Sequence, residues 1–135
     1  MTRALLFFAV SACLSLLATA CDDSRCSKVC EIQVDCPVAR AKERFPSCEW
    51  KRGTDAVREE CEAACEKAYS ELSPSEQDDV ASCWDCFEAE RHGACELDEL
   101  VAARVDCASD CQIDSIVEYD RRFVEGYDSP ELTCE

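Results

Sequence analysis

Residues 54–72 read TDAVREECEAACEKAYSEL and predict one amphipathic helix. Its apolar side chains recur at spacings of three and four residues, which places them on one helical face. They are Val57, Cys61, Ala64, Cys65, Ala68 and Leu72. Two of them are cysteines four positions apart, so their side chains lie one turn apart on the same face. The stretch therefore predicts a helix joined to a neighbouring helix by paired disulfide bonds.

The C-x3-C spacing occurs three times in the chain, at Cys26/Cys30, Cys61/Cys65 and Cys107/Cys111. Two such helices packed antiparallel can be joined by two disulfide rungs. This device resembles the stapled helical hairpins of the α-hairpinin and coiled-coil-helix families. The lengths between the cysteines match neither family, so the resemblance implies no activity. Connectivity cannot be deduced from the sequence.

The rest of the chain favours helix, because it is rich in Ala, Glu, Arg and Leu and poor in glycine. Strand patterns are weak. Ser73 and Glu76 are expected to form a capping box at the start of one helix, with Pro74 at the first helical position, and Gly93 is expected to end that helix. The expected helices cover residues 24–33, 37–45, 54–72, 74–93, 94–112 and 113–125. We predict an all-α fold, either a small disulfide-stapled helical bundle or stacked helical hairpins.

Each of the last three helices has an expected buried face. For residues 74–93 that face is Val80, Cys83, Trp84 and Phe87. For residues 94–112 it is Leu100, Ala103, Cys107 and Cys111. For residues 113–125 it is Ile113, Ile116, Val117 and Val124.

The first twenty residues, MTRALLFFAVSACLSLLATA, have the three-part plan of a secretory signal peptide. Arg3 precedes an uncharged run over residues 4–18, and small residues follow at the cleavage position. The run is shorter than the roughly 20 apolar residues of a membrane-spanning helix. We therefore expect export, with residues 1–20 removed.

Leu17-Ala18-Thr19-Ala20-Cys21 resembles the lipobox of bacterial lipoproteins. The resemblance implies that Cys21 receives the lipid and that the membrane is a partner. The family usually has leucine at the position of Ala18. A general signal peptidase could cut the same bond and release a freely secreted protein. The expected organisation is a signal peptide over 1–20, an anchor and tether over 21–25, and a cysteine-rich domain over 26–135.

The number of cysteines supports lipidation. From Cys21 onward the chain has thirteen cysteines, and an odd number in a secreted protein leaves one without a partner. If Cys21 carries lipid, twelve remain and can close as six disulfides. These candidates are Cys26, Cys30, Cys36, Cys48, Cys61, Cys65, Cys83, Cys86, Cys95, Cys107, Cys111 and Cys134. Such density in a short exported chain is typical of a disulfide scaffold.

The cysteine spacing also repeats. The pattern C-x11-C-x12-C-x3-C begins at Cys36, and C-x11-C-x11-C-x3-C begins at Cys83. This indicates two related halves, 26–72 and 73–135. Chance similarity is the alternative, because repeat arrays normally need about three units.

Two groups of residues are candidates for a reactive or metal-binding site. Cys83-Trp84-Asp85-Cys86 is a candidate for thiol–disulfide exchange, although acidic neighbours would raise a thiol pKa. Together with His92 and Cys95, the same two cysteines have a spacing that permits zinc. The alternative is that Cys83 and Cys86 each bridge to another helix. No nucleophile elbow, zincin motif or phosphate-binding glycine loop is present. We therefore expect no enzymatic activity, no cofactor and no bound metal.

The charge distribution limits the partners. The chain has a net charge of −16, and residues 59–135 hold 23 acidic against 5 basic side chains. Such a surface repels phosphate backbones and argues against nucleic acid as a partner. The predicted function is a non-catalytic structural or interaction module, lipid-anchored in a bacterial cell envelope and able to bind an unknown protein. The alternatives are a thiol–disulfide or metal-handling protein that uses Cys83 and Cys86, and a freely secreted effector or inhibitor.

Overall fold

Helix α3 (Thr54–Ser70) is the amphipathic helix that the sequence predicts. The computed structural model describes residues 25–128 and 130–134. Helix α3 ends two residues earlier than the predicted 54–72. The predicted apolar stripe is buried, including Leu72 just after the helix, and no member is more than 6% exposed: Val57, Cys61, Ala64, Cys65, Ala68 and Leu72. The helix begins after Gly53, whose φ of 84° is a left-handed conformation that glycine adopts without steric cost.

The N-terminal helical stretch runs without a break from residue 25 to residue 44. After a first segment over 25–30 come the π-helical turn η1 (Glu31–Asp35) and helix α2 (Cys36–Arg44). The prediction of two separate helices is therefore wrong. Pro37 explains the wide turn, because a proline ring clashes with the carbonyl four residues earlier in a regular α-helix. The stretch ends before Pro46, as predicted.

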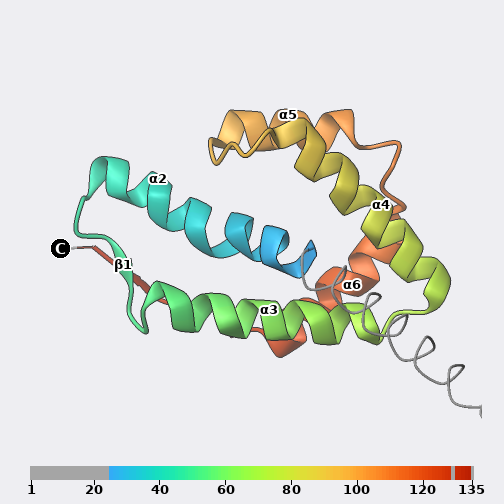
Figure 1. Ribbon diagram of the computed structural model, residues 1–135, viewed down its shortest axis with the longest axis horizontal. Helices are drawn as coiled ribbons and strands as arrows, with labels where there is room; N and C mark the ends of the chain where they lie inside the picture. Colours follow the sequence, from blue (N-terminus) through green and yellow to red (C-terminus); the bar gives the residue numbers. More distant parts are fainter. Residues whose placement is uncertain (1–24, 129, 135) are drawn as a thin grey trace, which may run out of the picture.

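Two disulfide rungs join this stretch to α3. Cys26 is bonded to Cys65 and Cys30 to Cys61, with Cα–Cα distances of 5.7 and 5.9 Å. The lower-numbered cysteine of one pair meets the higher-numbered cysteine of the other, so the two helices run antiparallel. Figure 1 shows them as the blue and green helices. All four cysteines are buried, which makes the rungs part of the hydrophobic core.

A short antiparallel ladder closes the C-terminal end of the chain. Strand β1 (Glu49–Trp50) pairs with β2 (Leu132–Thr133), and the neighbouring disulfide Cys48–Cys134 holds the two segments together. Trp50 also donates its indole N–H to the carbonyl of Val34, 3.0 Å away. The sequence did not predict these strands, because two residues are too few to show an alternating pattern.

Helix α4 (Pro74–Arg91) begins with the predicted capping box. Ser73 Oγ accepts from the N–H of Glu76, and the Glu76 carboxylate accepts from the N–H of Ser73. The helix ends at Arg91, after which His92 and Gly93 both have positive φ. Within its predicted buried face Val80 is fully buried, and the other three members are half-buried: Cys83, Trp84 and Phe87.

Helix α5 (Leu97–Asp106) is shorter than predicted. The chain leaves the helix at Cys107 and continues in turns to Asp110, where Ser and Asp residues favour turn conformations. Cys111 is therefore not on a helix, and the predicted helix over 94–112 is wrong at both ends. Ala103 and Cys107 are buried against α4, whereas Leu100 and Cys111 are half-buried.

Helix α6 (Ile113–Gly126) lies where the sequence predicts, but it presents a different face to the core. Three residues of the expected face are exposed by 59–76%: Ile113, Val117 and Val124. The buried residues are Ser115, Tyr119 and Phe123, with Ile116 half-buried. The larger aromatic rings decide the orientation, because they bury more apolar area than valine. The Tyr119 ring packs edge-on against Trp84, with centroids 4.9 Å apart, and stacks with Phe123.

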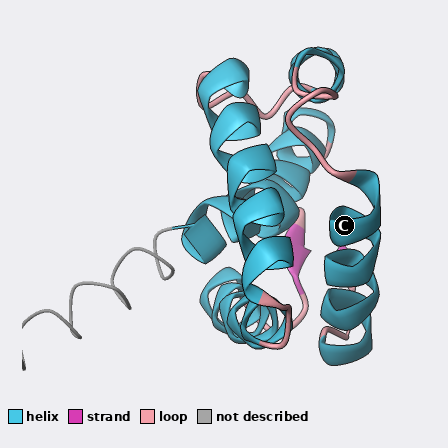
Figure 2. Cartoon of the chain, turned by 90° about the vertical axis from the view of Figure 1, so that its right-hand side faces the viewer, coloured by secondary structure: helices cyan, strands magenta, loops and turns pink. Residues whose placement is uncertain are grey.

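The disulfides predicted from the cysteine content are present. In addition to the two rungs and Cys48–Cys134, they are Cys36–Cys95, Cys83–Cys111 and Cys86–Cys107. Cys36–Cys95 and Cys48–Cys134 each link residues 26–72 to residues 73–135, so two disulfide bonds cross-link the two segments. The short strand ladder lies at one end of the molecule, where α2 ends and α3 begins, and Figure 2 views the helices from the opposite end. No helix in the described part of the chain is long and apolar enough to cross a bilayer.

Replacing Cys30 and Cys61 together by alanine should lower the free energy of unfolding by about 2–3 kcal/mol. The cost stays in the lower part of the range for disulfides because Cys26–Cys65 still closes nearly the same loop. Guanidinium unfolding of the oxidised wild-type and variant chains measures the difference. An unchanged midpoint and slope would show that this rung does not stabilise the fold.

Candidate functional site

The Cys83–Cys86 pair does not form its own disulfide. Cys83 is bonded to Cys111, with a Cα–Cα distance of 4.5 Å, and Cys86 to Cys107, with a distance of 5.8 Å. Both bonds tie α4 to the end of α5 and the loop that follows it. In this form neither sulfur is a thiolate, which is the species that attacks a disulfide or binds a metal.

The candidate zinc residues are likewise separated by their bonds. Cys95 is bonded to Cys36 of α2, while His92 lies at the end of α4 in a left-handed conformation. Within residues 25–128 and 130–134, no group of histidine, cysteine and carboxylate side chains is arranged to hold a metal ion. The disulfide form therefore does not assemble the zinc set that the spacing permits.

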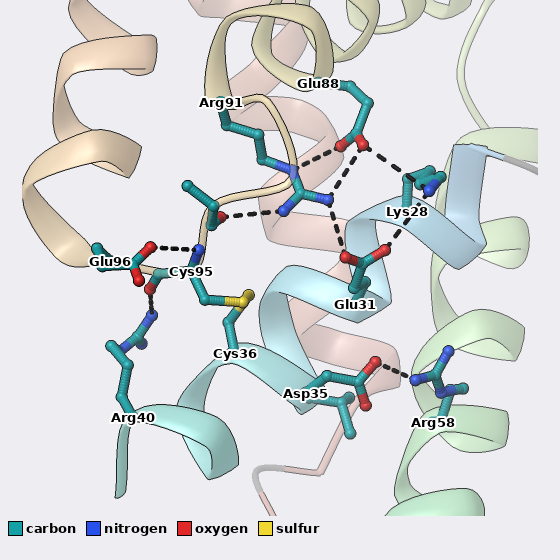
Figure 3. The surroundings of a disulfide bond; sticks show 12 residues. Lys28, Glu31, Asp35, Cys36, Arg40, Arg58, Glu88, Arg91, Cys95 and Glu96 are labelled. Carbon is teal, nitrogen blue, oxygen red and sulfur yellow. Dashed lines mark hydrogen bonds and ion pairs between the residues drawn. A yellow bond between two sulfur atoms is a disulfide. The ribbon is translucent and has the colours of Figure 1, made fainter. Parts of the chain in front are cut away.

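The structure instead assembles a charged cluster beside the Cys36–Cys95 bond, with Arg91 at its centre (Figure 3). The Arg91 side chain is fully buried, although it ends a helix that is otherwise rich in exposed polar residues. Its Nε donates to Glu88 at 2.7 Å and its Nη2 to the same carboxylate at 3.1 Å. Its Nη1 donates to the Ala94 carbonyl at 3.1 Å, and Glu31 lies 3.3 Å from Nη2.

The charges in this cluster balance one another. Burial lowers the pKa of Arg91, but the hydrogen bonds to Glu88 and Glu31 raise it by more, so the guanidinium stays charged. Lys28 lies 3.6 Å from Glu31 and 3.9 Å from Glu88, which places two cations against two carboxylates. A buried charge is tolerated only with such partners.

Further polar contacts connect the cluster to α2 and α3. Arg40 donates to the carbonyl of Cys95 at 2.6 Å, so the chain beyond α4 is held to α2 by a hydrogen bond as well as by the disulfide. Asp35 pairs with Arg58 of α3. Figure 3 shows these side chains converging on one corner of the fold from four segments.

This arrangement can fix the positions of helices, and it has no free reactive group. The carboxylates of Glu31 and Glu88 are neutralised, and the neighbouring sulfurs are in a disulfide. The sequence did not identify Arg91, Glu31 or Glu88 as important. The i,i+3 spacing of Glu88 and Arg91 was visible, but such pairs are common on exposed helices and give no sign of burial.

A second charged cluster fastens α6 to the end of α3. Glu118 accepts hydrogen bonds from Arg121 at 2.8 and 3.0 Å and from Arg122 at 2.7 Å. Arg122 also donates to Glu71, which follows α3, at 3.1 Å. The hydrogen bonds from Arg121, helped by those from Arg122, lower the pKa of Glu118 from 4.5 to about 2. This network uses both arginines of α6.

An open groove of about 380 Å³ lies between α3 and the C-terminal end of α6. Arg52, Glu60, Lys67 and Tyr127 are among its lining residues. Arg52 and Glu60 pair across 2.6 Å, so the groove already satisfies part of its own charge. It lacks the cluster of convergent polar groups and enclosed apolar surface that mark a small-molecule site.

Comparison of the chain with family models, with curated proteins and with solved structures gives no match.

Replacing Arg91 by methionine should lower the free energy of unfolding by about 3 kcal/mol, because Glu31 and Glu88 lose their main cation while partly buried. Thermal and guanidinium unfolding of the oxidised chain measure the loss. The matched control is Arg52→Gln, which removes an exposed arginine–glutamate pair and should cost less than about 1 kcal/mol. Equal losses in the two variants would contradict the role assigned to Arg91.

The Glu118 carboxyl should titrate near pH 2 in the folded chain and closer to 4.5 in Arg121→Gln. Because its folded-state pKa is depressed, the stability it contributes is present above about pH 4.5 and is lost as the pH falls toward 2. Carbon-13 NMR of the side-chain carboxyl follows both titrations. A pKa near 4.5 for Glu118 in the wild-type chain would show that the arginine network does not form in solution.

Proposed function

We propose that this protein is an exported, lipid-anchored module of a bacterial cell envelope that acts by its structure or by binding, without catalysis. The observation that carries the proposal combines the N-terminal segment with the disulfide pattern. Residues 1–20 have the plan of a signal peptide and end directly before Cys21. Both lie outside the described residues, so their role is inferred from the sequence.

The disulfide pattern supports Cys21 as the lipidated residue. The six bonds use all twelve cysteines from Cys26 to Cys134. In a chain cleaved before Cys21, that residue is then the odd cysteine. A free exposed thiol is a liability in an oxidising compartment, whereas a thioether to lipid removes it.

The position of the first disulfide indicates how close the domain would lie to the membrane. Cys26 is bonded into the core, and only five residue steps separate it from Cys21. A fully extended chain of that length spans at most about 18 Å. The proposed anchor would therefore hold the domain against the membrane surface.

The absence of catalysis is proposed from the state of the candidate groups. Cys83, Cys86 and Cys95 are in disulfides to three different partners. Glu31 and Glu88 are paired with Arg91 and Lys28, so the charges in the cluster around the buried Arg91 are balanced. These features favour a rigid scaffold that presents surfaces to partners.

The intact mass of the mature protein tests this function. The protein is isolated from membranes and from the culture supernatant, then alkylated under denaturing, non-reducing conditions. A diacyl or triacyl mass on a chain that begins at Cys21, with no alkylated thiol, is expected. The Cys21→Ser variant is the control, and it should lose the lipid while keeping all six disulfides.

Two outcomes would overturn parts of the proposal. An unlipidated chain in the supernatant with one alkylated cysteine would replace the anchored module by a freely secreted protein. Alkylation of Cys83 and Cys86 would show a reduced pair and favour thiol–disulfide or metal chemistry.

A further inference from the structure

Two helices carry nearly all of the exposed large apolar side chains in the described part of the chain. Seven such residues are exposed, and six of them lie on α5 and α6. The α5–α6 face is defined here as Leu97, Val101 and Val105 of α5 with Ile113, Val117 and Val124 of α6. They are 57–76% exposed. The seventh residue, Phe45, lies at the end of α2.

The spacing of these residues makes each set a stripe. Leu97, Val101 and Val105 follow one another at intervals of four, so they lie along one side of α5. Ile113, Val117 and Val124 also share one side of α6, at intervals of four and seven. Each helix is thus apolar on two sides, one facing the core and one facing solvent. A helix that only covers a core needs a single apolar stripe.

Helices α5 and α6 lie on the same side of the molecule. In Figure 2, α5 is seen end-on at the top and α6 runs down below it on that side. The disulfides Cys86–Cys107 and Cys83–Cys111 fix the connection between the helices to α4. Burial raises the pKa of Asp120 on α6 and the positive charge of Arg104 on α5 opposes this rise, which places these two side chains near each other.

Carboxylates outnumber cations on the two helices that carry the α5–α6 face. The segment from Leu97 to Gly126 contains eight acidic residues and three arginines. Arg121 and Arg122 are occupied by Glu118, Glu125 and Glu71, and Arg104 lies near Asp120. Within the described residues no cation pairs with the remaining carboxylates of the two helices, which are Asp98, Glu99, Asp106 and Asp114.

We propose that the α5–α6 face binds a basic amphipathic helix of a partner protein, whose apolar side covers the two stripes and whose lysines or arginines meet carboxylates next to them, such as Asp98 and Asp114. This inference rests on the proposed function and names its binding surface and the chemistry of its partner. A docking amphipathic helix uses apolar anchors at intervals of three, four and seven residues, and the two stripes offer apolar side chains for such anchors to contact.

Charge complementarity selects this occupant over two others. A second copy of the chain would bring together two surfaces of the same sign, in a protein with a net charge of −16. An anionic bilayer would meet the same repulsion. A cationic helix gains both from burial of the apolar stripes and from the unpaired carboxylates.

A pair of synthetic peptides tests the proposal. Both are amphipathic helices of about 18 residues, roughly five turns, with an identical leucine face. One carries lysine on its polar face and the other glutamate. Titration calorimetry with the oxidised Cys21→Ser chain, in detergent-free buffer, measures binding. We expect the lysine peptide to bind at least roughly tenfold more tightly than the glutamate peptide, with weaker binding at higher salt.

Substitutions in the chain locate the binding surface. The double substitution Val101→Ser and Val117→Ser removes one exposed apolar side chain from each helix. It should weaken binding of the lysine peptide at least roughly tenfold. The matched control is Phe45→Ser, which removes the exposed apolar side chain outside the face and should leave binding unchanged. Circular dichroism and a disulfide count by mass establish that all the variants are folded.

Several results would overturn the proposal. Equal binding of the two peptides, or binding insensitive to the paired valine substitutions, would rule out this face as a cationic-helix site. Concentration-dependent dimers that disappear in the paired variant would assign the face to a second copy. Vesicle binding lost in the same variant would assign it to lipid. None of these results changes the mass on Cys21, so failure here is distinguishable from failure of the proposed anchor.

Discussion

The two parallel rungs between the N-terminal helix and α3 are the constraint on which the rest of this structure depends. Because the lower-numbered cysteine of each pair is bonded to the higher-numbered cysteine of the other, the two helices must run antiparallel and in one register. Once Cys26–Cys65 and Cys30–Cys61 are closed, relative sliding of these helices is blocked. The buried side chains between and beside the rungs then pack in a single arrangement.

The same principle appears less regularly in the second hairpin. There Cys83 and Cys86, three positions apart on α4, meet Cys107 and Cys111, of which only the first adjoins a helix. Cysteines three apart on α4 can bond to cysteines four apart in sequence because the chain after Cys107 leaves the helix and turns, which brings Cys111 to Cys83. Covalent bonds thus compensate for a thin core, since α5 buries little besides Ala103 against its neighbour.

Stapling also explains how the chain tolerates an unusual distribution of charge and apolar surface. A buried arginine remains stable because Glu31 and Glu88 approach from two fixed elements, and it therefore acts as a clamp at the corner closed by Cys36–Cys95. On the other side, exposed valines and leucine persist on α5 and α6 because those helices do not depend on that surface for folding. In a scaffold held by disulfides, such faces can stay exposed without loss of the fold.

The sequence by itself determined the class of the fold, the amphipathic stripe of α3, the capping box at Ser73 and the presence of disulfide bonds, because each depends on residues close in the chain. Only the tertiary structure decided which cysteines pair, since spacing permits many connectivities. It also decided that Arg91 is buried and that α6 turns its aromatic residues inward, leaving Val117 in solvent. These features depend on what packs against each helix, and periodicity along one helix does not reveal which of two apolar sides will find a neighbour.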